Sequence, residues 1–150
     1  MDLPPSVTTA IFERKGLYYF KSDKLQSQEP HYFIIIEFEG KVVHLVVCAS
    51  DFEKCKFRIE KRNQDPCTLV RVKATADNDL KDNSYVDCNK VFSNYTLEIL
   101  EEKLSTGILT FKGIISDEDY LQLLTGIIAS NDVDKGVVLL IAKTLEAFNS

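Results

Sequence analysis

The sequence predicts an α+β fold that is mainly β: a small, strongly bent antiparallel β-barrel with short C-terminal helices. About five or six short apolar runs, separated by polar breaks, lie within roughly 95 residues, which favours a barrel over a parallel α/β sheet. Two of these runs flank the break Glu39-Gly40-Lys41, which is typical of a β-hairpin. Signals for helix starts come late in the chain, from Thr96 onward.

The predicted strands follow one another with polar connections between them. We expect strands at residues 17–20, 32–38, 41–48, 68–73, 84–88 and 108–112. The polar breaks at 21–29 and 76–83 are long enough to be loops. We therefore expect neither a parallel sheet nor a helix between successive strands before residue 90.

The first predicted helix begins after Thr96, whose hydroxyl can cap it. Its apolar face consists of Leu97, Leu100 and Leu104, and Gly107 can end it. Spacings of three and four residues place these leucines on one side of a helix.

Two further helices are predicted at the C-terminal end. Ser116 is followed by three acidic residues, a strong start signal for a helix over 116–129. A second apolar stripe predicts a helix within 133–148. The chain is therefore expected to form one domain over 1–150, with a barrel at 17–114 and a helical part at 116–150.

The composition is that of an ordinary globular protein, with 45% hydrophobic and 27% charged residues among 150. No apolar run approaches the roughly 20 residues needed to cross a bilayer, and the N-terminus does not resemble a secretory signal. We therefore expect a cytoplasmic protein without a membrane span. The four cysteines include no C-x-x-C pair and suit buried thiols in a reducing compartment. The formal net charge of −5 disfavours indiscriminate nucleic-acid binding.

The outer ends of the predicted hairpin carry the residues that point to a site. His31 opens the first run and Ser50 closes the second. If the two runs fold back on each other, these ends meet at one edge of the sheet. An imidazole beside a hydroxyl can transfer protons or bind a phosphate. A structural histidine and a turn serine are the alternatives.

A basic cluster begins four residues after Ser50. Between residues 54 and 62 five basic side chains accompany one acid, Glu60; the basic residues are Lys54, Lys56, Arg58, Lys61 and Arg62. Both a solvated loop and a local anion-binding surface are consistent with this pattern.

In this order the segments resemble the MazF/PemK family of endoribonuclease toxins, which have an SH3-like barrel with short helices. The resemblance covers roughly residues 17–130. It rests on His31-Tyr32 before an apolar strand, Ala49-Ser50 at the end of the next, and the order of the segments 84–91, 97–103, 109–113 and 116–128. The family's catalytic arginine falls on His31 and its threonine on Ser50. Serine keeps a hydroxyl, whereas histidine in place of arginine changes the proton chemistry.

The resemblance implies a metal-independent endoribonuclease toxin of a toxin–antitoxin module. Such an enzyme cleaves single-stranded RNA by attack of the ribose 2′-hydroxyl on the adjacent phosphorus. His31 and Ser50 would be catalytic. Phosphate binding and base stacking would fall to Lys54, Lys56, Arg58, Tyr18, Tyr19 and Tyr32. The expected partners are single-stranded RNA, a cognate antitoxin and a second copy of the chain, and no cofactor or metal is expected.

Two other functions remain open at this point. One is a non-catalytic SH3-like module that binds a protein partner, which the sequence pI of about 5.1 and the missing arginine favour. The other is an antitoxin or immunity protein, whose negative charge would imitate RNA.

Overall fold

The computed structural model describes residues 11–25 and 28–150. In this part of the chain seven antiparallel strands form a curled half-barrel, which confirms the predicted α+β, mainly β class. The strands are β1 (Gly16–Phe20), β2 (His31–Glu39), β3 (Val42–Ala49), β4 (Leu69–Val72), β5 (Ser84–Asp87), β6 (Phe92–Thr96) and β7 (Thr110–Ile114). The helices are α2 (Phe52–Lys61), the 3₁₀ turn η1 (Pro66–Thr68), α3 (Leu97–Ser105), α4 (Asp117–Ala129) and α5 (Lys135–Phe148).

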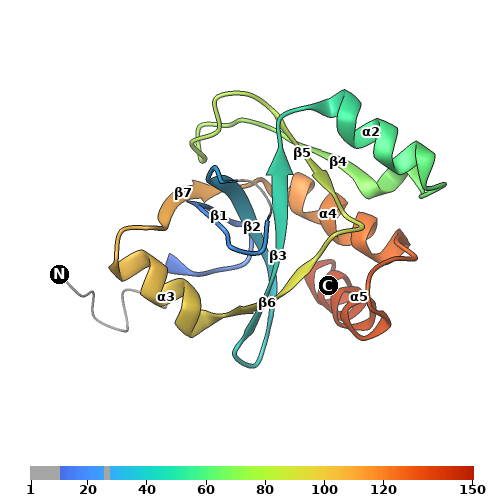
Figure 1. The fold of residues 1–150 in the computed structure, drawn as a ribbon. Coiled ribbons are helices and arrows are strands. Elements are labelled where there is room, and N and C mark those ends of the chain that lie inside the picture. The colour runs from blue at the N-terminus through green and yellow to red at the C-terminus, as the bar shows by residue number, and fades with distance from the viewer. Residues whose placement is uncertain (1–10, 26–27) are drawn as a thin grey trace.

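Strand β3 is the point at which the sheet bends. The strand order is β4-β5-β3-β2-β1-β7, and β6 pairs with β3 beside this path. Near its start β3 pairs with β6, with Val42 opposite Thr96. At its far end it pairs instead with β5, with Cys48 opposite Val86. Because β6 pairs with the first part of β3 and β5 pairs with its last part, the sheet divides into two lobes along β3 (Figure 1).

The two faces of β2 enter two separate cores. Ile34 and Ile36 belong to the cluster that α4 and α5 cover, whereas Phe33 and Ile35 belong to the cluster that α3 helps to close. Alternate side chains of a strand point to opposite faces. Because both faces of β2 are buried, every position in the middle of this strand must be apolar. Figure 1 shows α3 on one side of β3 and the pair α4 and α5 on the other. The hairpin β2–β3 is therefore a rigid platform.

The helices after residue 96 are confirmed, and their caps form as predicted. The Thr96 hydroxyl accepts a hydrogen bond from the Ile99 amide at 3.2 Å, and the Ser116 hydroxyl accepts one from the Asp119 amide at 3.1 Å. Each cap satisfies an amide that has no partner within the helix, and losing one costs about 1 kcal/mol.

The expectation of no helix before residue 90 is wrong, because α2 lies between β3 and β4. The Asp51 carboxylate caps it, accepting from the Lys54 amide at 3.0 Å. Cys55 and Ile59, one turn apart, are buried against the body of the protein. The density of charge suggested a solvated loop, although four-residue spacing of two apolar residues is also sufficient to anchor a surface helix.

Two strands also differ from the prediction: β6 was missed, and β7 begins later than expected. Strand β6 was not predicted because a bulge turns both Phe92 and Tyr95 toward the same core, which breaks the two-residue alternation. Strand β7 begins later than residue 108, since the amides of Ile108 and Leu109 both donate to the Lys103 carbonyl and so end α3.

Candidate functional site

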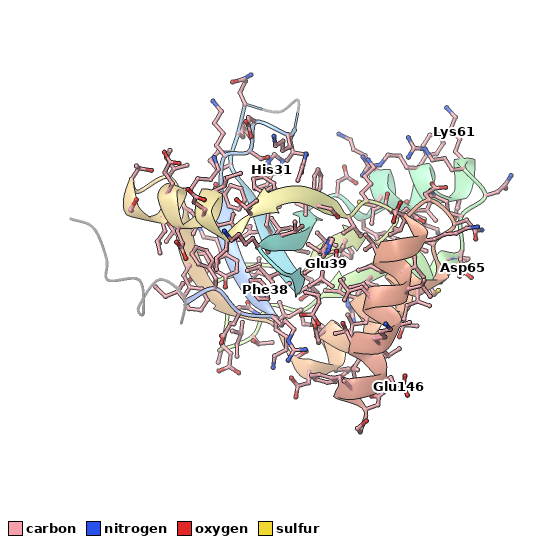
Figure 2. The ribbon with its side chains drawn as sticks, turned by 90° about the horizontal axis from the view of Figure 1, so that it is seen from below. His31, Phe38, Glu39, Lys61, Asp65 and Glu146 are labelled. Carbon is pink, nitrogen blue, oxygen red and sulfur yellow. The ribbon has the colours of Figure 1, made fainter. Side chains whose placement is uncertain are left out.

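His31 and Ser50 lie at the same end of the β2–β3 hairpin and line one cavity of about 830 Å³. Phe33 pairs with Val47 in this hairpin, so the register carries His31 to the level of Ala49, next to Ser50. Figure 2 labels His31 and Glu39, the two ends of β2. The hairpin therefore places both residues on the wall of one cavity.

The His31 imidazole is half-buried, and its Nδ1 lies 2.9 Å from the Glu29 carbonyl oxygen. A carbonyl oxygen only accepts hydrogen bonds, so Nδ1 carries the hydrogen. In the neutral ring Nε2 then holds the lone pair. This nitrogen can take a proton from a bound molecule, which is the property required of a general base.

Ser50 is exposed and directly precedes Asp51, the N-cap of α2. Its hydroxyl is one of the polar groups on the cavity wall. The Asp51 carboxylate occupies part of the helix N-terminus, so the amide of Lys54 is already satisfied. Anion binding here must therefore rely on side chains rather than on the helix end.

Lys54 and Arg58, one helical turn apart on α2, both line the cavity. Arg58 is half-buried; its Nη2 lies 3.5 Å from the Cys55 sulfur, and its Nε is buried without a hydrogen-bond partner in the described part of the chain. Within residues 11–25 and 28–150 no carboxylate forms an ion pair with either side chain. These two cations are placed to meet an anion that enters the cavity.

Lys56 is not part of this group, which corrects the sequence prediction. A step of two residues along a helix turns a side chain by about 200°, so Lys56 points away from Lys54 and Arg58. It lines a neighbouring groove of about 560 Å³ and lies 3.9 Å from the Glu60 carboxylate. Its ammonium group also sits 5.9 Å from the centre of the Phe52 ring.

The tyrosines divide in the same way. Tyr19 and Tyr32 are cross-strand neighbours whose rings lie 4.7 Å apart, and both line the cavity. Tyr18 faces the opposite side of β1 and is 1% exposed, so the prediction that it stacks on a nucleic-acid base is wrong. Its hydroxyl donates to the Ile11 carbonyl oxygen at 2.6 Å, and burial raises its pKa above the usual value.

Several lining residues come from segments that the sequence prediction did not include. The exposed ring of Phe57, on α2, adds a third aromatic side chain to the cavity. The loop before β5 contributes Lys81, Asp82 and Asn83. Since these residues lie far from His31 in the sequence, no local pattern links them to it.

The cavity wall is of mixed charge. Alongside His31, the cations on it are Lys54, Arg58 and Lys81, and the carboxylates are Glu29, Asp51, Glu53 and Asp82. The wall is therefore not a uniformly positive surface, and Asp51 and Glu53 lie at α2 together with Lys54 and Arg58.

The cysteine at the cavity does not supply a nucleophile. Cys48 lines the cavity but is buried, and this burial raises the pKa of its thiol to about 12. A thiol is reactive as its thiolate, which this environment disfavours. All four cysteines are free; Cys48, Cys55 and Cys88 are buried as expected, whereas Cys67 is exposed.

None of the helices within the described residues is long and apolar enough to traverse a bilayer. In the same part of the chain no three His, Cys, Asp or Glu side chains are grouped so that they could share a metal ion.

No protein-family model and no curated protein sequence matches this chain. The functional argument is therefore carried by the geometry of the cavity.

Proposed function

We propose that the protein is a metal-independent endoribonuclease that cleaves single-stranded RNA, as the resemblance to MazF/PemK toxins implies. One observation carries this proposal: a single cavity is lined by His31, Ser50 and two cations of α2, Lys54 and Arg58, that form no ion pair within the described residues. A base, a neutral donor and positive charge are the groups that cleavage of a phosphodiester by its own ribose requires.

In the proposed reaction Nε2 of His31 takes the proton of the ribose 2′-hydroxyl. The 2′-oxygen attacks the adjacent phosphorus, and the bond from phosphorus to the 5′-oxygen breaks. Arg58 and Ser50 donate hydrogen bonds to the phosphate oxygens as negative charge gathers on them. The leaving 5′-oxygen lies opposite the attacking oxygen, so a second donor must protonate it, and the Lys54 ammonium is our candidate. The products are a 2′,3′-cyclic phosphate and a free 5′-hydroxyl.

Aromatic side chains at the cavity support a single-stranded substrate. The Tyr19–Tyr32 pair and the exposed Phe57 ring offer faces on which unpaired bases can stack. Each stacked base contributes about 1–3 kcal/mol to binding. A duplex keeps its bases stacked on one another and would lose this contribution.

Incubation of the purified protein with a long unstructured RNA in EDTA tests the proposal. We expect cleavage to persist and to leave cyclic phosphate termini, because the attacking group belongs to the substrate. The same sequence as 2′-deoxy oligonucleotide should remain intact, since it lacks the nucleophile. Cleavage of the deoxy strand, or loss of all activity in EDTA, would contradict the proposed chemistry.

Two basic residues of α2 form a matched pair for testing RNA binding. Arg58→Ala removes a cation from the cavity, so we expect about tenfold weaker binding and a salt dependence reduced by about one counterion. Lys56→Ala removes the same charge from the adjacent groove and should have little effect. Binding titrations at several salt concentrations measure both quantities. Equal losses in the two variants would mean that overall charge, not the cavity, attracts the RNA.

A protein-binding module is the second candidate function. The four carboxylates on the cavity wall would suit a basic partner, and the adjacent groove is lined by the apolar residues Phe52, Ile59, Leu69 and Tyr85. An antitoxin with a basic segment would be such a partner. Absence of cleavage of any RNA, together with a stable complex between this protein and the product of a neighbouring gene, would favour this alternative.

A further inference from the structure

A second group of reactive side chains lies near the opposite end of the hairpin from His31. His44, on β3, is 2% exposed. Its Nδ1 lies 2.7 Å from the Ser93 hydroxyl, and its Nε2 lies 3.0 Å from a carboxylate oxygen of Glu39. Glu39 is the labelled residue at the end of β2 in Figure 2. Hydroxyl, imidazole and carboxylate thus form a continuous hydrogen-bonded chain.

Both strands that pair with β3 near His44 have a register shift at this point. On β6, Phe92 pairs with Leu45 and Tyr95 with Val43, so Ser93 and Asn94 together oppose the single residue His44. On β2 a second register shift falls between Ile35 and Glu37, opposite the same stretch of β3. Bulges redirect side chains and are frequent beside active sites. Here the β6 bulge lies where Ser93 meets the imidazole.

The hydrogen bonds define the state of the His44 ring. An ionised carboxylate only accepts hydrogen bonds, so Nε2 carries the hydrogen toward Glu39. Nδ1 then has the lone pair and accepts from the Ser93 hydroxyl. In the familiar serine triads the two ring nitrogens have the reverse roles, but either nitrogen can take the proton of a hydroxyl. Glu39 orients the ring and would stabilise the imidazolium.

Ser93 also opens onto a groove of about 320 Å³. Its walls are mixed: Val91, Phe92, Val133 and Val137 form the apolar part, and Asn89, Asp132 and Asp134 add polar groups. Lys90, which is half-buried, is the cation on these walls among the described residues. The apolar part of the groove offers room for a short acyl group.

We propose that Ser93 is the nucleophile of an esterase site that accepts small esters with short apolar acyl groups. The Ser93 oxygen forms a bond to the ester carbonyl carbon as His44 takes the serine proton. The carbon–oxygen bond to the alcohol then breaks, and His44 gives that proton to the departing oxygen. Water, activated by the same imidazole, hydrolyses the acyl-serine and releases the carboxylic acid. This site shares no lining residue with the His31 cavity.

A fluorophosphonate probe and p-nitrophenyl acetate test the proposal. We expect the probe to label one site, which peptide mass spectrometry locates at Ser93. Ser93→Ala should abolish labelling and lower ester hydrolysis by about 10²-fold or more. Ser105→Ala is the matched control, because this exposed serine bonds only to the Glu102 carbonyl in the described structure. Ser93 is exposed, so its replacement removes no packing from the core.

Glu39 is a positioning residue, and its role is tested separately. Glu39→Gln should slow labelling about tenfold or more, and Glu39→Asp should restore part of the rate. The thermal midpoint should stay near that of the wild type, since the Glu39 side chain is 61% exposed. A folded wild-type protein that neither takes the probe nor hydrolyses the ester faster than Ser93→Ala overturns the proposal, as does labelling at any other residue.

Discussion

Replacing His31 with alanine is expected to lower the rate of RNA cleavage by roughly 10²-fold or more, the usual scale for losing an acid–base group. No second imidazole lies on the described cavity wall, so the variant loses the type of side chain that most often acts as a general base. RNA affinity should change little, because Lys54, Arg58 and the aromatic rings remain. Single-turnover cleavage at saturating protein, with a separate binding titration, distinguishes rate from affinity.

His31→Gln is the companion variant. The glutamine amide can still donate a hydrogen bond, as Nδ1 does to the Glu29 carbonyl at 2.9 Å, but it cannot take a proton at neutral pH. We expect it to be as inactive as the alanine variant if His31 transfers protons. Substantial activity in the glutamine variant would show instead that the histidine serves to shape the cavity edge.

The largest effect on stability is expected from Gly113→Ala. Gly113 has a φ of +99°, and a Cβ atom there would lie 2.2 Å from the Asp77 carbonyl oxygen. A left-handed backbone costs a non-glycine residue about 1–2 kcal/mol. The clash with backbone atoms adds to this, so we expect a loss of about 3 kcal/mol or more in the free energy of unfolding. Denaturant unfolding measures it.

Gly107→Ala is the matched control for this substitution. Its φ of +78° is also left-handed, but nothing lies within 4 Å of the added Cβ. Only the backbone cost of about 1–2 kcal/mol is expected there. Similar losses at the two positions would mean that the close approach between β7 and the segment around Asp77 contributes little. That segment leads directly into Lys81, Asp82 and Asn83 of the cavity wall.

Local patterns predicted the parts of the fold that short-range chemistry decides. The caps at Thr96 and Ser116 and the hairpin around Gly40 depend on a few adjacent residues, so the sequence alone revealed them. Strand β6 was missed because its bulge puts Phe92 and Tyr95 on one side. Helix α2 was missed because its charge hid the spacing of Cys55 and Ile59.

For the candidate site, too, the sequence predicted the features that depend on nearby residues and missed those that depend on distant elements. His31 and Ser50 share a hairpin end, so sequence spacing alone brought them together. The choice between Tyr18 and Tyr19, or between Lys54 and Lys56, depends on which face of an element is buried. Which face is buried depends on the neighbouring elements, which the local sequence does not reveal. The loop before β5 reaches the cavity because β5 pairs with β3, and this long-range pairing was not predictable either.

The junction between β3 and β5 has a consequence for how the cavity moves. These strands are joined by two registered pairs, Cys48 with Val86 and Ala49 with Tyr85, whereas β4 and β5 share four. Helix α2, which packs beside this junction through the buried side chains of Cys55 and Ile59, can separate locally at lower free energy than global unfolding requires. In native-state hydrogen exchange its amides should exchange ahead of those in β2. Because α2 carries Lys54 and Arg58 while the hairpin carries His31, such local opening of α2 would set the width of the cavity available to a nucleotide chain.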